Sequence, residues 1–437
     1  MKHGFLALLL VVLAIGSWEA GAQGRAIRIV SENVADTRIL IAVPDIVPMP
    51  GLEAVAKELG DVLRFDLTFT GLFNVAPRTQ YPPGFIGFTQ EATQIDFGAW
   101  RAARVQDLVH VCISVEGSSL VAQCRLFDTA TGSQLVGQRL TTDQSHPRLA
   151  IHRFSEEIVR AVSGVPGIAS SEICFSAVVD GKKEIFVSDY DGANVTQVTR
   201  HGSISIKPKF SPDGRYIAYL SYKDRYPFLY VFDRRTGASA PLSKKVGLNA
   251  APSWSPDSAT LAIVLSKDGN TEIYLTNRDG SGLRRLTNDR AGDTSPSFSP
   301  DGRQIAFVSD RGGKPQVYAM NADGSNVRRL SYQGGNSYDP MWSPDGKFIA
   351  YVSEKPGEGL EIYVMGADGS NARPLTQSQG SNESPSWSGD SRHVVFASTR
   401  SGKSELWAVT VETGEEFRLS SMGAPCQGPY WGPRRAG

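Results

Sequence analysis

The sequence lacks an excess of either charge, and histidine is scarce. Lysine and arginine together number 45, aspartate and glutamate also number 45, and no basic block stands out. Without a basic surface there is no electrostatic footprint for nucleic acid or for an anionic membrane. Of the 6 histidines, only His201 and His393 lie in the region from residue 165 to the end of the chain. This is too few for a clustered imidazole metal site, so we expect no metal and no cofactor.

A nucleophile motif is also missing. The chain has no G-x-S-x-G pentapeptide, which an α/β-hydrolase domain needs for its catalytic serine. His110, His146 and His152 are scattered over the first half, where we expect surface or capping roles. Carboxylates are abundant, but nothing in the sequence makes two of them converge. We therefore predict a protein without enzymatic activity.

Long apolar runs are absent except at the N-terminus. Lys2 precedes an almost unbroken apolar stretch over Phe5–Ile15, and Ala20-Gly21-Ala22 supplies the small residues of a cleavage site. A membrane-spanning helix needs about 20 apolar residues, more than this stretch contains. The pattern is typical of a secretory signal peptide over residues 1–22. We expect an exported protein that starts near Gln23 and does not insert into a membrane.

Cysteine is rare, with 4 residues in the chain. In an oxidising compartment such residues tend to form disulfides. Cys112 and Cys124 lie on two strand-like segments that flank Gly117-Ser118-Ser119, and a three-residue loop there places them opposite each other. A disulfide and two buried free thiols both remain open, because register read from sequence is uncertain by one residue. The strand pairing expected at the chain ends does not oppose Cys174 directly to Cys426.

What the sequence does contain is a repeat. An aromatic residue, then Ser, then Pro or Gly, then Asp recurs five times, with successive aromatic residues 44, 44, 44 and 45 positions apart. A period of about 40 to 50 residues indicates a propeller or a solenoid. The copies are Phe210–Asp213, Trp254–Asp257, Phe298–Asp301, Trp342–Asp345 and Trp387–Asp390.

One period contains four strand-like segments separated by turns. Ser299-Pro300-Asp301-Gly302 and Asp323-Gly324 mark two of these turns. A helical solenoid would need ten or more residues of helical periodicity in each repeat, and none is present. Four strands in each period indicate a propeller blade. The segments are Ser295–Phe298, Ile305–Ser309, Gln316–Met320 and Val327–Ser331.

The first and last periods complete each other. The first blade begins at Ile173–Val179 and has no aromatic-Ser-Pro strand of its own. The corresponding strand occurs at the C-terminus as Pro429–Pro433, and Trp431 lies 44 residues after Trp387. The C-terminal strand is therefore predicted to close a six-bladed ring, which removes exposed sheet edges.

The residues between the signal peptide and the repeats follow a different pattern. Apolar residues recur at helical spacing over Gly51–Phe65 and Arg148–Val162. Thr37–Val43, Leu108–Val115 and Leu120–Phe127 are strand-like. The sequence thus predicts a signal peptide over 1–22, an α/β N-terminal domain over 23–164 and an all-β six-bladed propeller over 165–437.

Two polar features of the repeats suggest different roles. The aspartates of the turns recur in every copy, so we predict that they bond neighbouring backbone groups and hold the turn. The residues just before each inner strand vary and lie on loops at one mouth of the channel. Short polar and aromatic residues on loops of a rigid scaffold suit protein recognition, although ordinary solvated loops have a similar composition.

Together these features resemble the TolB family of the Tol-Pal envelope system. The resemblance covers nearly all of the mature chain. It rests on Ile41-Ala42-Val43-Pro44, Gly71-Leu72-Phe73, Tyr190-Asp191-Gly192 and Trp431-Gly432-Pro433. Single aromatic-Ser-Pro-Asp repeats occur in many propellers, and their combination with a signal peptide and this front domain is more specific. The resemblance implies a monomeric periplasmic binding protein that maintains outer-membrane integrity and its constriction during cell division.

The resemblance also implies two partners. TolA of the inner membrane would bind the mature N-terminal segment, whose alternation suits addition to a partner sheet. The peptidoglycan-associated lipoprotein would bind at the channel mouth. The matching residues are Arg25, Ile27, Arg28, Ile29 and Val30 for TolA, and Leu248, Asn249, Ala251, Asp293, Thr294, Tyr338, Asp339, Asn382 and Glu383 for the lipoprotein. Leu248 departs from the polar or histidine residue that is common at its position in the family.

Two other classes of protein fit the propeller pattern. One is a hydrolase that uses the propeller funnel, which a bound metal or turnover of an envelope substrate would favour. The other is a sensor propeller that binds an unrelated envelope partner. Binding to an unrelated receptor domain, with none to the lipoprotein, would favour this last class.

Overall fold

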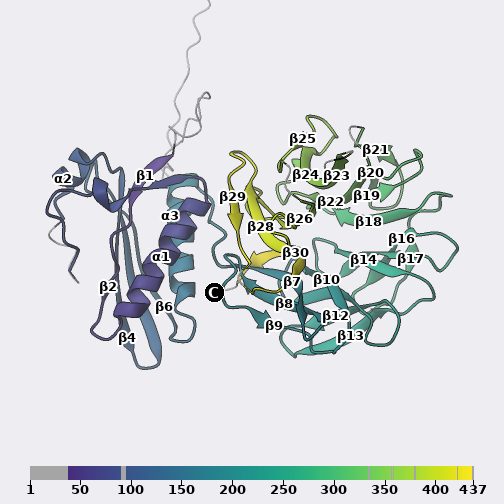
Figure 1. Cartoon of the computed structure of the whole chain (residues 1–437), viewed down its shortest axis with the longest axis horizontal. Helices are drawn as coiled ribbons and strands as arrows, with labels where there is room; N and C mark the ends of the chain where they lie inside the picture. Colours follow the sequence, from purple (N-terminus) through teal and green to yellow (C-terminus); the bar gives the residue numbers. More distant parts are fainter. Residues whose placement is uncertain are drawn as a thin grey trace, which may run out of the picture.

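The computed structural model describes residues 38–89, 95–332, 335–355, 357, 359–377, 380–420 and 422–435. An α/β domain and a β-propeller lie side by side, and the C-terminal strand ends near their junction (Figure 1). None of the helices in these ranges has the length and apolar character needed to cross a membrane. The predicted signal peptide and the predicted TolA-binding residues Arg25, Ile27, Arg28, Ile29 and Val30 lie outside the described residues.

The N-terminal domain is a mixed sheet with two long helices packed on one face. The strands run in the order β3-β1-β4-β5-β6, and β2 pairs with β4. Helices α1 and α3 bury Leu59, Leu63, Phe154 and Ile158 against the sheet, which confirms both helices expected from apolar spacing. The elements are β1 (Ile39–Ala42), β2 (Val47–Pro48), α1 (Glu53–Phe69), β3 (Phe73–Val75), η2 (Arg78–Gln80), α2 (Phe97–Ala102), β4 (Asp107–Glu116), β5 (Ser119–Asp128), β6 (Gln134–Asp143) and α3 (Arg148–Ser163).

The hairpin of β4 and β5 decides between the two alternatives left open for Cys112 and Cys124. Cys112 lies opposite Gln123, and Cys124 lies opposite Val111. Because side chains alternate along a strand, this shift of one residue from direct opposition places the two thiols on opposite faces of the sheet. Both cysteines are buried. The structure therefore has two buried thiols and no disulfide between these strands.

Six four-stranded sheets form the propeller, as the repeat predicted. Each inner strand begins with the residues before an aromatic-Ser-Pro motif. The blades are, in ring order, β30-β7-β8-β9, β10-β11-β12-β13, β14-β15-β16-β17, β18-β19-β20-β21, β22-β23-β24-β25 and β26-β27-β28-β29, numbered blade 1 to blade 6.

The strands of these blades are mostly six residues long. The inner strands are β30 (Cys426–Arg434), β10 (Ser205–Phe210), β14 (Asn249–Trp254), β18 (Asp293–Phe298), β22 (Ser337–Trp342) and β26 (Asn382–Trp387). The remaining strands are β7 (Ser171–Val179), β8 (Lys182–Asp189), β9 (Thr196–Gln197), β11 (Tyr216–Ser221), β12 (Phe228–Asp233), β13 (Ala238–Ser243), β15 (Thr260–Leu265), β16 (Glu272–Asn277), β17 (Arg284–Arg285), β19 (Gln304–Ser309), β20 (Gln316–Asn321), β21 (Arg328–Arg329), β23 (Phe348–Lys355), β24 (Gly359–Gly366), β25 (Arg373–Pro374), β27 (His393–Ser398), β28 (Glu405–Thr410) and β29 (Glu416–Arg418).

The C-terminal strand closes the ring. Strand β30 pairs antiparallel with β7, with Trp431 opposite Ile173 and Tyr430 opposite Cys174. Cys426 lies opposite Ala177, so Cys174 and Cys426 are not opposed, in agreement with the sequence. The prediction that the last strand of the chain completes the first blade is confirmed.

A glycine allows blade 1 to approach blade 6 closely. Gly192 follows β8 in the left-handed region, at φ +83°. A Cβ atom at this position would lie 1.6 Å from the backbone oxygen of Leu419 in blade 6. No side chain larger than hydrogen fits without moving backbone, which explains the glycine of the Tyr190-Asp191-Gly192 sequence.

The turn aspartates are structural, as predicted. In blade 4 the Ser299 hydroxyl donates to Asp301 Oδ1 at 2.6 Å, and the backbone N–H of Arg303 donates to the same oxygen at 3.0 Å. The Ser299 hydroxyl oxygen also accepts from the N–H of Gln304 at 2.9 Å. The same Ser–Asp bond is present in the other four copies of the motif. These bonds satisfy the backbone of the turn and occupy the aspartate oxygens.

The motif tryptophans differ in one hydrogen bond, which gives a test. The indole N–H of Trp387 donates to the Met341 carbonyl at 2.9 Å, whereas that of Trp342 has no partner among the described residues. Both side chains are buried. We expect Trp387→Phe to lower the free energy of unfolding by about 1–2 kcal/mol more than Trp342→Phe, because only the former leaves a buried carbonyl unpaired. Urea denaturation of the two variants measures the difference, and equal losses would contradict it.

Candidate partner-binding site

The channel of the propeller opens at two mouths. At the upstream mouth, where the inner strands begin, a cavity of ≈ 260 Å³ is lined mainly by residues of these strands from the second position onward. At the downstream mouth, where they end, a cavity of ≈ 330 Å³ is lined by the aromatic-Ser-Pro turns. Tyr430 and Met341 line both cavities. The two mouths therefore belong to one channel with different chemistry at its ends.

A recurring bulge shapes the upstream mouth. The third residue of each inner strand has a positive φ, between 44° and 57°, and a proline follows it. The pairing register shifts at this point in every blade. The bulge re-aims side chains next to the channel, as bulges do at the rims of sheets. The residues with positive φ are Lys207, Ala251, Ser295, Asp339, Ser384 and Gly428, and all six line the cavity.

Four of the residues predicted to bind the lipoprotein line this cavity. They are Leu248, Ala251, Thr294 and Asp339. Tyr338 and Glu383 lie beside them at the second position of their strands, where Tyr338 is half-buried and Glu383 is exposed. These six side chains are positioned for contact with a molecule that covers the mouth.

The other three predicted residues are buried, and the structure corrects their assignment. Asn249, Asp293 and Asn382 each begin an inner strand and have exposed fractions of 0%. Asn249 accepts from the hydroxyl of Ser243 at 2.7 Å, and Asn382 donates to Glu361 at 2.9 Å. Asn249 and Asn382 thus each join an inner strand to the preceding blade, and none of the three side chains faces a partner.

Charge inside the upstream mouth comes from two lysines and one aspartate. Lys207 Nζ lies 3.2 Å from Asp339 across the channel, which raises the pKa of Lys207 and lowers that of Asp339. The Ser295 hydroxyl also donates to Asp339 at 2.9 Å. Lys209 faces the ring of Tyr430, 5.9 Å from its centroid. Burial lowers the pKa of Lys209 to about 8.

The titration of Lys209 is a measurable consequence. Asp339 favours the charged form of Lys209, so Asp339→Asn is expected to shift the pKa of Lys209 below about 8. NMR of the reductively ¹³C-methylated protein, followed against pH, measures this shift. Asp279→Asn, on an exposed turn at the other face of the propeller, is the control and leaves Lys209 unchanged. Titration of Lys209 near its ordinary value in the wild-type protein would contradict the assignment.

An apolar rim surrounds the upstream mouth, and the sequence did not reveal it. In the described part of the blades, eight large apolar side chains are exposed, and six of them lie on loops at this face. Val246 is 88% exposed, Tyr332 71% and Tyr226 65%. These loops have no periodicity that marks their side chains as exposed. The apolar rim consists of Ile204, Tyr222, Tyr226, Val246, Leu248 and Tyr332.

The N-terminal domain packs against the opposite face. Phe69, at the end of α1, is stacked on His393 at 4.4 Å between ring centroids and lies 5.2 Å from Tyr190. His393 Nε2 donates to the Phe69 carbonyl at 2.7 Å. These two propeller residues lie at the downstream ends of strands in blades 6 and 1. Blades 1 and 6 lie beside the N-terminal domain in Figure 1. The described residues of this domain thus leave the upstream mouth uncovered.

Two histidines expected at the surface are buried instead. His110 is 1% exposed and its Nε2 lies 2.9 Å from the Thr89 carbonyl. His152 is 2% exposed and its Nδ1 lies 2.9 Å from Asp66 Oδ2. The prediction of surface or capping roles is wrong for both, and His146 alone of the three is exposed.

The chemistry at the upstream mouth suits binding. Its described lining holds hydroxyl groups at Thr294, Ser295 and Ser384 but no histidine or cysteine. The one carboxylate of this lining, Asp339, accepts from the Ser295 hydroxyl and is paired with Lys207. The combination of apolar rim, preformed cavity and partly desolvated lysine matches the anatomy of a protein-docking surface.

Comparisons with known proteins identify the family. The model of the TolB β-propeller domain matches residues 159–433, and that of the TolB amino-terminal domain matches residues 27–135. A crystal structure of TolB from Acinetobacter baumannii superimposes with a TM-score of 0.80 at 27% identity, covering 90% of this chain and 96% of that chain.

Among curated relatives, the Tol-Pal system protein TolB of Geobacter sulfurreducens is 41% identical over 163 residues, or 37% of each chain. That of Cereibacter sphaeroides is 34% identical over 249 residues, or 55% of each chain. The chain thus spans about a third to just over half of the length of the curated relatives it matches. With an amino-terminal α/β domain, six blades and a propeller model that matches most of its length, the chain belongs to the TolB family.

Proposed function

We propose that this protein is a non-enzymatic, periplasmic component of the Tol-Pal system whose propeller binds the peptidoglycan-associated lipoprotein. The observation that carries the proposal is the apolar rim around the upstream mouth. Relatives named Tol-Pal system protein TolB support the assignment to this system. An N-terminal run typical of a signal peptide supports export to the periplasm.

The lipoprotein docks with its apolar anchors on the rim and a protruding loop in the cavity. Exposed patches rimmed by polar residues mark protein-interaction sites, and buried aromatic and aliphatic anchors supply most of the binding energy. The anchors are Tyr226, on the loop between β11 and β12, and Val246 and Leu248, on the loop that leads into β14. Lys207, Lys209 and Asp339 give the cavity a net positive charge, which favours an acidic group on the entering loop.

The second partner is TolA, bound through the mature N-terminal segment. Arg25, Ile27, Arg28, Ile29 and Val30 alternate in a way that suits addition to the edge of a partner sheet. Binding of TolA at one end of the chain and of the lipoprotein on the propeller makes the protein a link between the two membranes. Such a link maintains outer-membrane integrity and draws the membrane inward during cell division.

Calorimetric titration with the soluble domain of the lipoprotein from the same organism tests the docking surface. Thr294 is half-buried in the upstream cavity, so Thr294→Arg fills part of the cavity and adds a positive charge. We expect the dissociation constant to rise at least about tenfold, which corresponds to about 1.4 kcal/mol. Val246→Asp, which alters an exposed rim residue, is expected to weaken binding by a similar factor.

Thr236→Arg is the matched control. Thr236 is exposed on the turn between β12 and β13, at the downstream face, so the same substitution there leaves lipoprotein binding unchanged. Equal weakening by Thr294→Arg and Thr236→Arg would contradict docking at the upstream mouth. Absence of binding by a well-folded wild-type protein would remove the lipoprotein as the partner.

A further inference from the structure

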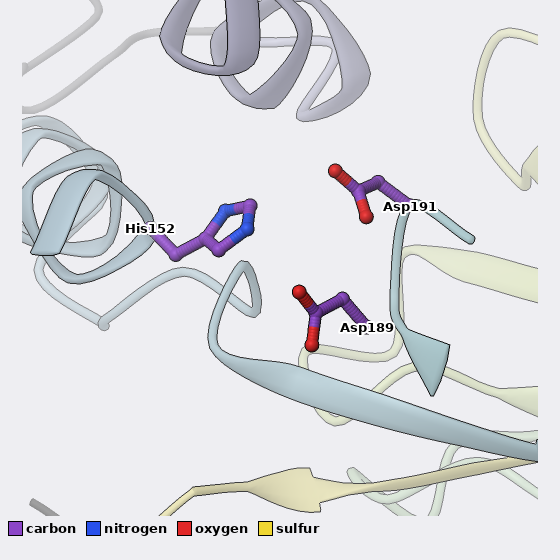
Figure 2. A group of neighbouring side chains, drawn as sticks. All are labelled: His152, Asp189 and Asp191. Carbon is purple, nitrogen blue, oxygen red and sulfur yellow. The ribbon is translucent and has the colours of Figure 1, made fainter. Parts of the chain in front are cut away.

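A group of buried ligand-type side chains lies between α3 and blade 1, away from the channel. His152 comes from α3, Asp189 ends β8, and Asp191 lies on the turn after it. Figure 2 shows the imidazole of His152 directed between the two carboxylates, which point back toward it. His152 is 2% exposed and Asp189 is 3% exposed. The proposed binding surfaces do not use any of these residues.

The orientation of His152 is fixed from behind. Its Nδ1 lies 2.9 Å from Asp66 Oδ2, and the other Asp66 oxygen accepts from the Tyr190 hydroxyl at 2.7 Å. With Nδ1 donating to a carboxylate, the free ring nitrogen is Nε2. Histidines that bind metals are held in this way, with the second nitrogen bonded to a carboxylate that sets the tautomer.

The free nitrogen has no hydrogen-bond partner. Nε2 of His152 is buried, and nothing in the described part of the chain bonds to it. It faces Asp189 and Asp191, and one ligand atom from each of the three residues lies within 4.8 Å of the others. A neutral imidazole would direct its lone pair at two carboxylates, which is unfavourable unless a cation lies between them.

The ion pairs around the group leave an excess of negative charge. Arg148 pairs with both Asp191 and Glu58, and Arg435 pairs with both Asp189 and Glu172. The carboxylates of the network are Glu58, Asp66, Glu172, Asp189 and Asp191, and its guanidinium groups are those of Arg148, Arg234 and Arg435. With His152 neutral, two negative charges remain uncompensated, which a divalent cation balances.

We propose that His152, Asp189 and Asp191 bind a divalent transition-metal ion of the zinc class, which ties α3 of the N-terminal domain to blade 1 of the propeller. One imidazole and two carboxylates are a zinc-type ligand set, with a water in the fourth position. Bond lengths of about 2.0–2.2 Å require the three side chains to draw in slightly around the ion. A neighbouring cavity of ≈ 510 Å³ is lined by Asn194 and Arg435, whose side chains donate to Asp189.

A proton on Nε2 of His152 is the competing occupant of the same position. It supplies one positive charge to this network, whereas a divalent ion supplies two.

Titration of the metal-stripped mature protein with Zn²⁺, in competition with a chromophoric chelator, tests the proposal. We expect one equivalent to bind, and Co²⁺ to give the visible absorption of a low-symmetry site. His152→Gln and Asp191→Asn are each expected to weaken binding by at least about 100-fold, because losing a ligand costs more than losing an outer partner. Circular dichroism shows whether each variant is folded.

His201→Gln is the control for zinc bound at other histidines, because His201 lies in blade 1, where it contacts Tyr219 of the next blade. It is expected to bind Zn²⁺ like the wild-type protein. Zinc affinity that is the same in wild type and in a folded His152→Gln variant would overturn the proposal. So would a folded Asp191→Asn variant that binds Zn²⁺ as tightly as the wild-type protein. Neither outcome depends on whether the lipoprotein binds.

Discussion

Asp293→Arg is expected to unfold the propeller in mild denaturant rather than to act on partner binding alone. Asp293 is fully buried at the start of β18, and its two oxygens accept from Arg311 Nη2 at 3.0 and 2.9 Å. The substitution removes the carboxylate that is bonded to this nitrogen and places a second guanidinium beside it. Among the described residues, the only ion pair that Arg311 then keeps is a longer one, with Asp289 at 3.8 Å. Loss of one partner of a buried ion pair costs about 3–5 kcal/mol, and the like-charge contact adds to this loss. Urea denaturation followed by tryptophan fluorescence measures the effect.

The neighbouring residue provides the control for Asp293→Arg. Thr294 is half-buried and lines the open cavity, so Thr294→Arg places the same side chain where it reaches solvent. Its free energy of unfolding should stay within about 1 kcal/mol of that of the wild type. An Asp293→Arg variant as stable as Thr294→Arg would mean that the ion pair between Arg311 and Asp293 does not contribute to the stability of the propeller. Only the Thr294 variant is suited to testing partner binding.

The contrast between Asp293 and Thr294 shows how much of the candidate site can be predicted from the sequence. The repeat places the residues before each inner strand at the channel mouth, and the structure confirms this for Leu248, Ala251, Thr294 and Asp339. The repeat does not say which of the side chains at the mouth face the channel. A bulge at the third residue of each inner strand changes the direction of the side chains there, while the side chain of the first residue is buried in Asn249, Asp293 and Asn382. The sequence therefore placed three residues at the correct mouth but wrongly predicted that their side chains face a partner. These residues are Asn249, Asp293 and Asn382.

Fold class was predictable because blades depend on local pairing. Each antiparallel hairpin is joined by a turn that Pro, Asp and Gly specify, and the regular spacing of the aromatic residues counts the blades. The position of Trp431 at the same spacing was enough to predict closure by β30. The register of a hairpin is less certain. The sequence left a Cys112–Cys124 disulfide and two separate thiols both open, and a register that differs by one residue from direct opposition decides for the thiols.

Contacts between segments far apart in the chain were not predictable. The carboxylates of Asp189 and Asp191 meet His152 only because α3 packs on the downstream face of blade 1. No periodicity links these residues, and their separation along the chain carries no signal of a shared site. The apolar rim was not predictable for a similar reason, because its residues come from separate loops of blades 1 to 4.

In the proposed function, the two faces of the propeller have different roles. The upstream mouth is open for a protein partner, whereas the downstream turns of blades 1 and 6 hold the N-terminal domain. Strand β30 runs from the upstream mouth to the downstream face. Its Tyr430 lines the channel, and the ring centroid of Trp431 lies 6.2 Å from that of Phe69. A partner that shifts β30 at the mouth therefore acts on a strand that contacts the domain interface.

Phe69→Ala is expected to lower stability by about 3–5 kcal/mol and to uncouple the two domains. Phe69 is 1% exposed and packs on Tyr190, His393 and Phe417, with ring centroids 4.4 to 5.2 Å away. Truncation leaves a cavity at the centre of the interface between α1 and blades 1 and 6. We expect thermal unfolding to split into two transitions, since each domain has its own core. Cleavage near Gly164–Gly167 by a protease should become faster as the domains separate.

Phe307→Ala separates loss of stability from loss of coupling. Phe307 is fully buried inside blade 4, away from the N-terminal domain, so the same truncation costs a similar free energy there. It should lower the unfolding temperature of the propeller and leave the rate of cleavage near Gly164–Gly167 under native conditions unchanged. If both variants opened that segment equally, the interface would have no special role in holding the domains together. Faster cleavage in Phe69→Ala alone would show that this aromatic contact fastens the N-terminal domain to the propeller.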